Sequence, residues 1–294
     1  MNKEDWIKAG KLSHKLLKYG EKKIKNVSSI LELVKQMEEK LENLNSDASF
    51  GFPINVSIDN CAAHDSARYN DDRELSGLVK LDVGIDYNGA IGDNALTVNL
   101  SDNDYSDLMD SSFESLNNAY ELLKEGEFSI DEISKKIEST MESYNIKPVS
   151  NLMGHGLDIG VIHGEPRIPN INTNVNKKFE NNSFFAIEPF GTYGSGYVKE
   201  KGDAEIYSMK SFKPLRSRFA KKISNYIKNH YDKKPFSKRW IIEEFGEGKT
   251  NIAFKQMKNK DMIKDYPPLV DDDLVSQFEY SFGIIDNQVI RLTK

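Results

Sequence analysis

One stretch of the chain, residues 78–99, constrains the fold most, because its pattern predicts a β-hairpin with a fixed register. Apolar residues recur at every second position from Val79 to Ile85, and the Asn-Gly pair that follows is a strong signal for a two-residue turn. With these turn residues, Asp82 and Asp93 become diagonal neighbours on one face, while the opposite face is apolar. The hairpin therefore predicts two carboxylates that converge on one point.

The two aspartates allow two interpretations. They can belong to an ordinary solvated polar face, which is the more frequent case for an isolated hairpin. They can instead hold a cation, since two close carboxylates repel and one takes up a proton unless a positive charge lies between them. Ile91 and Ala95 share their face, which predicts that this face is at least half covered.

The composition excludes several classes of protein. The 294 residues, with 38% hydrophobic content, can form one large domain or two ordinary ones. No run of about eighteen apolar residues predicts a membrane span, and the charged N-terminus lacks the apolar segment of a secretory signal. The single cysteine, Cys61, excludes an internal disulfide and fits a reducing cytosol, so a cytoplasmic location is expected. The net charge of -6 argues against a protein devoted to nucleic acid.

Helices are predicted on both sides of the hairpin. Residues 3–45 and 102–144 carry apolar residues at three- and four-residue spacing, which indicates two pairs of helices, each with a serine N-cap before its second helix. The strongly polar residues 65–74 are expected to form an exposed loop that leads into the hairpin. None of these segments carries an evident chemical signal.

Two histidines and two glutamates further along the chain do indicate a site with chemical activity. His155 and His163 lie in a glycine-rich segment whose bends can present both imidazoles to one cavity. Glu188 and Glu279 lie among apolar residues, in SFFAIEPF and LVSQFEYSFGII, where an unpaired carboxylate costs several kcal/mol. A salt bridge explains one such glutamate. Two of them, beside a converging aspartate pair, favour a metal centre.

The candidate ligands form an oxygen-rich set, namely Asp82, Asp93, His155, Glu188 and Glu279. Four carboxylates and one imidazole are too many and too acidic for a structural zinc ion, which prefers four Cys and His ligands. The set suits two divalent ions that share bridging carboxylates, activate a water and polarise a carbonyl. The predicted chemistry is hydrolysis.

Five segments resemble, in the same order, those of the pita-bread metallopeptidases, and within them the type II methionine aminopeptidases. They are FPINVSIDNCAAH (52–64), KLDVGIDYNGAIGDNALTV (80–98), NLMGHGLDIGVIHGEPRIPNI (151–171), FFAIEPFGTYGSGYV (184–198) and YPPLVDDDLVSQFE (266–279). The resemblance implies an α+β pita-bread fold, a pseudo-symmetric antiparallel sheet covered by helices. It further implies a catalytic domain at 1–207 and 265–294, interrupted by a helical, winged-helix-like insertion at 208–264.

The resemblance also implies roles for the ligand residues. Asp82 would hold one divalent ion, His155 and Glu188 would hold the other, and Asp93 and Glu279 would bridge both. Cobalt, manganese, iron and zinc all suit such a site. Glu188 would also shuttle a proton while water attacks the first peptide bond.

The remaining residues implied by the resemblance contact the substrate. His64 and His163 would bond the scissile amide and its carbonyl, and Phe52 and Ala253 match positions that line the pocket for a methionine side chain. The implied activity is co-translational removal of the N-terminal methionine from nascent proteins when the second residue is small. The family suggests a cytoplasmic monomer.

Three other interpretations remain open. A proline-directed aminopeptidase of the same fold uses the same five ligands, and a non-enzymatic binding protein of this fold would be expected to have lost some of them. Residues 213–239 hold ten basic residues and one acidic residue, Asp232. Such a run is usually a solvated helix face. The alternative is attraction to ribosomal RNA, which weakens steeply with salt.

Overall fold

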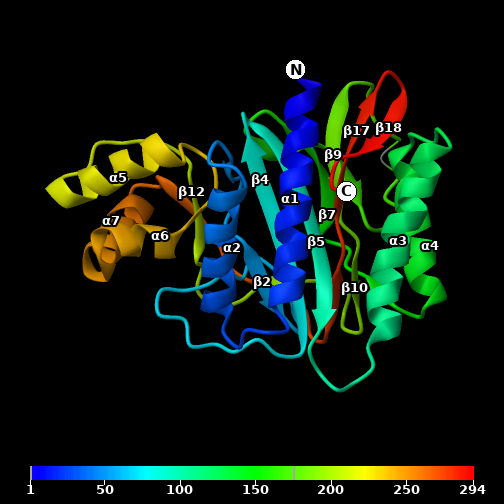
Figure 1. Cartoon of the computed structure of the whole chain (residues 1–294), viewed down its shortest axis with the longest axis horizontal. Helices are drawn as coiled ribbons and strands as arrows, with labels where there is room; N and C mark the ends of the chain where they lie inside the picture. Colours follow the sequence, from blue (N-terminus) through cyan, green and yellow to red (C-terminus); the bar gives the residue numbers. More distant parts are fainter. Residues whose placement is uncertain (1, 175) are drawn as a thin grey trace.

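The computed structural model describes residues 2–174 and 176–294 as antiparallel sheets flanked by helices, which confirms the predicted α+β class (Figure 1). The helices are α1 (Lys3–Lys23), α2 (Ile30–Leu44), α3 (Ser106–Lys124), α4 (Ile130–Ser143), α5 (Arg218–His230), α6 (Lys238–Phe245) and α7 (Glu247–Asn259). The longer strands are β2 (Asn55–Ile58), β4 (Leu78–Tyr87), β5 (Ala90–Asn99), β7 (Met153–Asp158), β8 (Val161–Pro169), β9 (Ser183–Ile187), β12 (Ile206–Met209), β14 (Ile263–Tyr266), β17 (Tyr280–Ile285) and β18 (Gln288–Arg291). The shorter strands are β1 (Ser49–Phe50), β3 (Cys61–Ala63), β6 (Lys147–Pro148), β10 (Phe190–Thr192), β11 (Lys199–Glu200), β13 (Phe236–Ser237), β15 (Leu269–Val270) and β16 (Val275–Gln277).

The central hairpin of β4 and β5 has the predicted register. Asp82 pairs with Ala95 and Gly84 with Asp93, and Asn88 in the turn takes a φ of +54°, which this type of turn requires. The apolar face of the hairpin is covered by α1 and α2 and shares one hydrophobic core with them (Figure 1). The opposite face is therefore left to carry the polar residues.

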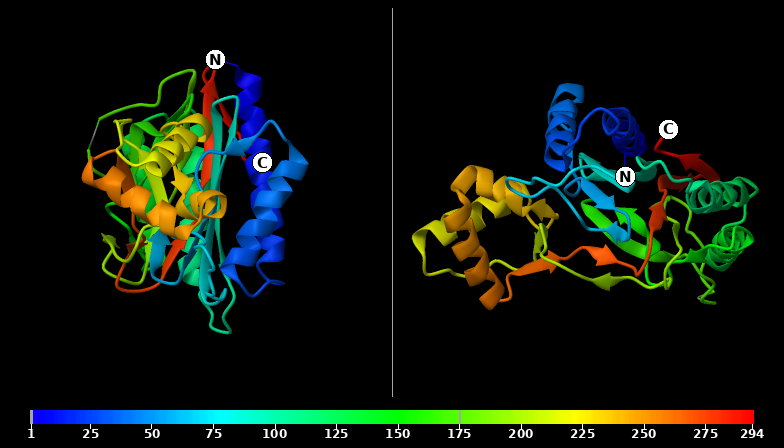
Figure 2. Two further views of the ribbon diagram at one scale, coloured as in Figure 1. Left: turned by 90° about the vertical axis from the view of Figure 1, so that its left-hand side faces the viewer. Right: turned by 90° about the horizontal axis from the view of Figure 1, so that it is seen from below.

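A second helix pair and a second hairpin form the other half of the core. Helices α3 and α4 share a hydrophobic core with the five-stranded sheet, whose strand order is β18-β17-β9-β7-β8. As predicted, the second helix of each pair begins after a serine N-cap, Ser29 before α2 and Ser129 before α4. Figure 2 shows the two helix pairs at separate places around the strands. A β-bridge between Ala95 and Glu279 joins the two halves.

The segment between β12 and β14 lies to one side of this core (Figure 1). Helices α5, α6 and α7 surround a hydrophobic core of their own, which includes Ile223, Ile241 and Met257. Strands β12 and β14 pair with Ile206 opposite Tyr266, so the chain leaves and re-enters the larger core at neighbouring points. This arrangement supports the insertion predicted at 208–264, whose boundaries remain a prediction.

Residues 65–74 differ from the expected exposed loop, because the first three of them are buried. The guanidinium of Arg73 lies 2.6 Å from the carboxylate of Asp65 and 2.8 Å from that of Asp71. These charge-assisted hydrogen bonds satisfy polar groups inside the protein. The prediction from polar composition was therefore wrong for this part of the segment.

Candidate metal centre and substrate cavity

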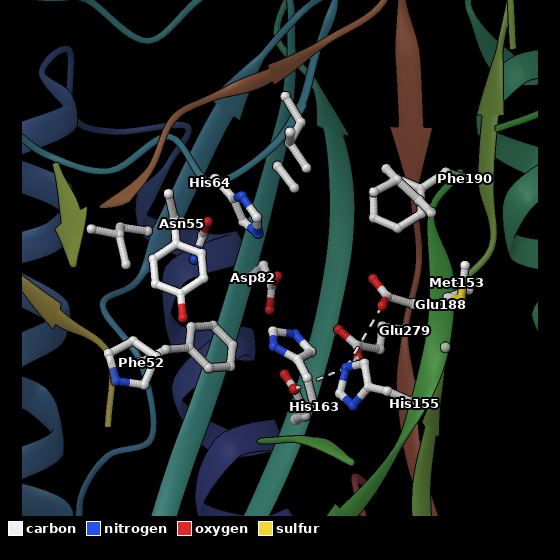
Figure 3. A pocket seen from close by; sticks show the side chains of 18 of the residues that line it. Phe52, Asn55, His64, Asp82, Met153, His155, His163, Glu188, Phe190 and Glu279 are labelled. Carbon is white, nitrogen blue, oxygen red and sulfur yellow. Dashed lines mark ion pairs between the residues drawn. The ribbon is translucent and has the colours of Figure 1, made fainter. Parts of the chain in front are cut away.

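The five predicted ligands come from both halves of the core. Asp82 and Asp93 lie on β4 and β5, and His155 lies on β7. Glu188 directly follows β9, and Glu279 lies between β16 and β17. All five line one cavity, and Figure 3 shows how the labelled side chains among them point into it. Residues almost 200 positions apart in sequence thus meet because the hairpin is joined to the second sheet.

His155 lies at the centre of the carboxylates. Its Nε2 atom is 3.8 Å from Asp93 Oδ2, 3.6 Å from Glu188 Oε1 and 3.8 Å from Glu279 Oε1. Ligand atoms of Asp93, His155 and Glu279 all lie within 4.8 Å of one another. These separations are too long for direct hydrogen bonds. They leave room for a cation that all the groups share.

The cavity makes it costly for these groups to carry charge together. Burial raises the pKa of Asp82 to about 7. Burial, followed by repulsion from neighbouring carboxylates, raises the pKa values of Asp93, Glu188 and Glu279 well above their ordinary values. Burial lowers the pKa of His155, which keeps its imidazole in the neutral form that binds metals.

Carboxylate oxygens without hydrogen-bond partners show whether the five predicted ligands suit a metal ion. Buried carboxylate oxygens of Asp82, Asp93 and Glu279 have no hydrogen-bond partner among the described residues. Within the same residues, no lysine or arginine forms an ion pair with any of the four carboxylates. Buried charges in this state cost several kcal/mol. Divalent cations would remove that cost, so the residues fit a metal centre rich in oxygen ligands.

His64 and His163 line the cavity beside the ligands. The rings of His163 and His155 are 4.5 Å apart and nearly perpendicular, at 80°. His64 follows β3 with a φ of +65°, and its ring contacts that of Tyr266 at 5.7 Å. Burial lowers the pKa of His64 to about 4, and the pKa of His163 is lowered too, although its side chain keeps contact with solvent. Two neutral imidazoles can each donate one hydrogen bond and accept another.

The two residues predicted to line a side-chain pocket have different locations. The cavity has a volume of about 430 Å³, and Phe52 lines it. The ring of Phe52 lies over Gly84, where an added Cβ would come within 2.1 Å of it, so this contact requires glycine. Ala253 lies on α7 in the hydrophobic core of the insertion, and the described residues that line the cavity do not include it. The structure does not bring Ala253 to the site.

Asn55, Lys264 and Tyr266 are among the lining residues that were not predicted from the sequence. Asn55 lies directly opposite Asp82 because β2 pairs with β4. Asn55 and Tyr266 both lie inside segments that resemble the metallopeptidases, so the resemblance contained a signal for them. Lys264 lies outside the five segments given above for the resemblance, and the pairing of β14 with β12 places it beside the cavity.

Comparisons with known proteins show the family to which the chain is similar. The model of metallopeptidase family M24 matches residues 4–211. The chain is 35% identical to a methionine aminopeptidase of Archaeoglobus fulgidus, over 99% of this chain and 98% of that protein.

Two solved structures resemble the fold. One, a thermophilic Arx1, covers 98% of this chain and 89% of its own, with 18% identity and a TM-score of 0.79. The other, a methionine aminopeptidase from Rickettsia prowazekii, covers 100% of this chain and 98% of its own, with 18% identity and a TM-score of 0.68. Together with the family match, these likenesses confirm the predicted pita-bread fold.

Proposed function

Because the chain belongs to metallopeptidase family M24, we propose that it is a metal-dependent aminopeptidase that removes the N-terminal methionine from newly made proteins. The methionine aminopeptidase of Archaeoglobus fulgidus supports this choice, since the similarity extends over nearly the full length of both chains. The observation that carries the proposal is the convergence of all five predicted ligands in one cavity that two neutral histidines also line.

Two divalent ions are proposed at this centre. Asp82 would hold one ion, His155 and Glu188 the other, and Asp93 and Glu279 would bridge them. Bound ions would supply Lewis-acid chemistry, which activates water and polarises a carbonyl at neutral pH. The buried, unpartnered oxygens of the set support this assignment. Cobalt, manganese, iron and zinc all accept such donors, and site geometry together with metal availability in the cell decides among them.

The protein's own groups would orient the substrate and move the proton. Glu188 would accept a proton at its carboxylate and return it to the leaving amine, a role supported by its burial and raised pKa. His64 and His163, both neutral, would bond the scissile amide and its carbonyl oxygen. Phe52, which lines the cavity, would contact the methionine side chain, and the family resemblance implies a preference for a small second residue.

The hydrolysis of a short peptide panel tests this function. Peptides that begin Met-Ala, Met-Gly, Met-Lys and Ala-Pro are incubated with metal-loaded and with metal-stripped protein, and the released amino acid is measured. The proposal expects rapid release of methionine from the Met-Ala and Met-Gly peptides alone, and its loss on stripping. Cleavage of Ala-Pro instead would assign a proline-directed enzyme. The absence of cleavage with every metal would favour a binding protein.

The insertion is proposed to attract the enzyme weakly to ribosomes. Among the ten basic residues at 213–239, Lys234 is paired with Asp86 at 3.1 Å, and Arg239 lies between Glu38 and Glu243. Most of the others, including Lys221 and Lys222 on α5, are exposed. We expect co-sedimentation with ribosomes at low salt that disappears at high salt. Association with ribosomes that does not change with salt concentration, or no association at low salt, would contradict this proposal.

The remaining proposals concern the state and location of the protein. Among the described residues, no helix is both long and apolar enough to cross a membrane. We propose a monomer in the cytoplasm, where nascent chains are available as substrates. Light scattering of the purified protein tests the monomer, and a dimeric mass would contradict it.

A further inference from the structure

We propose that Lys264 selects among substrates by favouring peptides that carry an acidic residue at the third or fourth position. This inference rests on the proposed aminopeptidase function and adds a specificity residue to it. The observation behind it is a free positive charge on the lining of the cavity, beside the histidines proposed to hold the scissile bond.

The position of Lys264 defines how far its charge can reach. It lies on β14 opposite Ser208 of β12, and its Nζ atom is 4.4 Å from the centre of the Tyr266 ring. That ring lies 5.7 Å from the ring of His64. The ammonium is therefore within about 10 Å of His64, the length of about three extended residues. A substrate held at His64 brings its third and fourth residues within this reach.

Outside the proposed metal centre, two of the other charges on the lining are compensated within the protein. The carboxylate of Asp265 is 2.5 Å from Lys258, and Arg167 faces Glu165 at 3.7 Å. Lys264 has no carboxylate partner among the described residues and contacts only an aromatic face. Glu200 also lines the cavity without an ion pair in the described part of the chain, and it lies on β11, in the sheet that also contains β3.

The charge of Lys264 acts on both substrate histidines. It contributes to lowering the pKa of His64 and that of His163, after burial as the main cause. The ammonium therefore lies near the histidines that are proposed to hold the scissile bond, and a peptide bound there would place its following residues within reach of the ammonium. A carboxylate on that part of the peptide would gain an attractive interaction with Lys264, and an ammonium would be repelled.

Two peptide series test this inference with metal-loaded protein. The peptides Met-Ala-Xaa-Gly and Met-Ala-Gly-Xaa carry Asp, Asn or Lys at Xaa and are amidated, so that no terminal carboxylate interferes. At low salt, we expect wild-type kcat/KM to be about two- to fivefold higher for Asp than for the isosteric Asn in at least one series. Lys264→Met should bring this ratio to about 1, and Lys264→Glu should invert it. High salt should remove the preference, since it screens the charge.

Lys255→Glu is the matched control, because Lys255 is an exposed lysine of the insertion without an ion pair among the described residues and lies outside the cavity lining. It should keep the wild-type ratio. An unchanged ratio in Lys264→Glu, or an equal change in Lys255→Glu, would overturn the inference. Calorimetric binding of the same peptides to Glu188→Gln protein repeats the comparison without turnover. If wild type releases no methionine from any peptide, the proposed function fails, and the binding ratio still decides on Lys264.

Discussion

Two clusters of buried carboxylates, one around Arg73 (Asp65 and Asp71) and one in the cavity, differ in how their negative charges are balanced. Although burial opposes ionisation of Asp71, hydrogen bonds from Arg73 and from the backbone hold its pKa below the ordinary value. In the cavity, burial and mutual repulsion raise the pKa values of Asp93 and Glu279. The first cluster has its positive charge within the chain, although Asp65 Oδ1 has no hydrogen-bond partner among the described residues, whereas the second needs positive charge from outside. Unbalanced buried charge thus separates a functional cluster from a structural one.

The largest expected effect concerns a residue that works on the reaction. Glu188→Gln keeps the shape of the side chain but cannot shuttle a proton, so we expect kcat to fall by about 10²- to 10⁴-fold. Release of methionine from a Met-Ala peptide measures this, and metal analysis shows how much metal the variant holds. Glu165→Gln, which changes an exposed carboxylate of β8, is the control and should keep turnover. Wild-type turnover in Glu188→Gln would place the proton shuttle elsewhere.

Removal of the Arg73 guanidinium should leave Asp65 and Asp71 as buried carboxylates without a positive partner, like those of the cavity. Arg73→Met leaves Asp65 and Asp71 buried without their partner, so the free energy of unfolding should fall by about 3 kcal/mol. Urea denaturation measures the loss. Lys124→Met breaks an exposed pair with Glu121 and should leave stability unchanged. A small effect of Arg73→Met would mean that solvent or other groups satisfy these carboxylates.

His64 separates substrate contact from metal binding. His64→Ala should lower kcat/KM by about 10²-fold, because a hydrogen bond to the reacting amide is lost, while metal content stays at the wild-type level. Activity assays and metal analysis on the same sample give both values. Loss of metal from this variant would contradict the assignment of His64 as a substrate residue.

The two clusters should respond to pH in opposite directions. In the metal-free protein, the raised pKa values of the cavity carboxylates contribute stability at acidic pH, and this is lost as pH rises toward about 7, the pKa of Asp82. The lowered pKa of Asp71 contributes stability above its ordinary value, which is lost only in acid. The lowered pKa values of His64, His155 and His163 have the opposite effect below their ordinary value of 6.5. We therefore expect the melting temperature of stripped protein to fall by several degrees between about pH 6.5 and 8, where these histidines are neutral, and added metal to reverse the fall. A flat profile for stripped protein would contradict the raised values.

Neutralising one carboxylate in each cluster gives the smallest effect and the most direct contrast. Asp93→Asn relieves repulsion and should stabilise the metal-free protein by about 1 kcal/mol, while Asp71→Asn weakens its pairing with Arg73 and should destabilise it by a similar amount. Denaturation of the two stripped variants measures both signs. If both variants lose stability, Asp93 makes a favourable interaction in the metal-free protein, and the predicted repulsion among the cavity carboxylates is wrong.

The features predicted from sequence are those with a local physical cause. The register of β4 and β5 follows from a two-residue turn and the pleat, so the amino-acid sequence alone predicts that Asp82 and Asp93 lie together. Glu188 was predicted because apolar neighbours surround it in the sequence itself. The convergence of the two halves at Ala95 and Glu279 has no local signal. It was predicted from the chemistry of the five candidate ligands taken together, and then from the family resemblance.

The failures share a nonlocal cause. The burial of Asp65 depends on its pairing with Arg73, and composition does not show which charges find a partner. Lys264 reaches the cavity only through the pairing of β12 with β14. Ala253 matched a pocket position by resemblance, but the packing of α7 places it inside the insertion. In each case the partner, rather than the residue type, determines the environment.

The hydrogen bonds between Ser281 and the backbone of Asp93 have a consequence for the order of events during synthesis of the protein. The Ser281 hydroxyl accepts from the backbone N–H of Asp93 at 2.8 Å and donates to its carbonyl at 2.6 Å, across a separation of 188 residues. During synthesis, the hairpin with both aspartates emerges long before Glu279 and Ser281 do. We therefore expect metal loading at the proposed centre to be a late step that requires Glu279, and a copy truncated before Glu279 to lack both metal binding and activity.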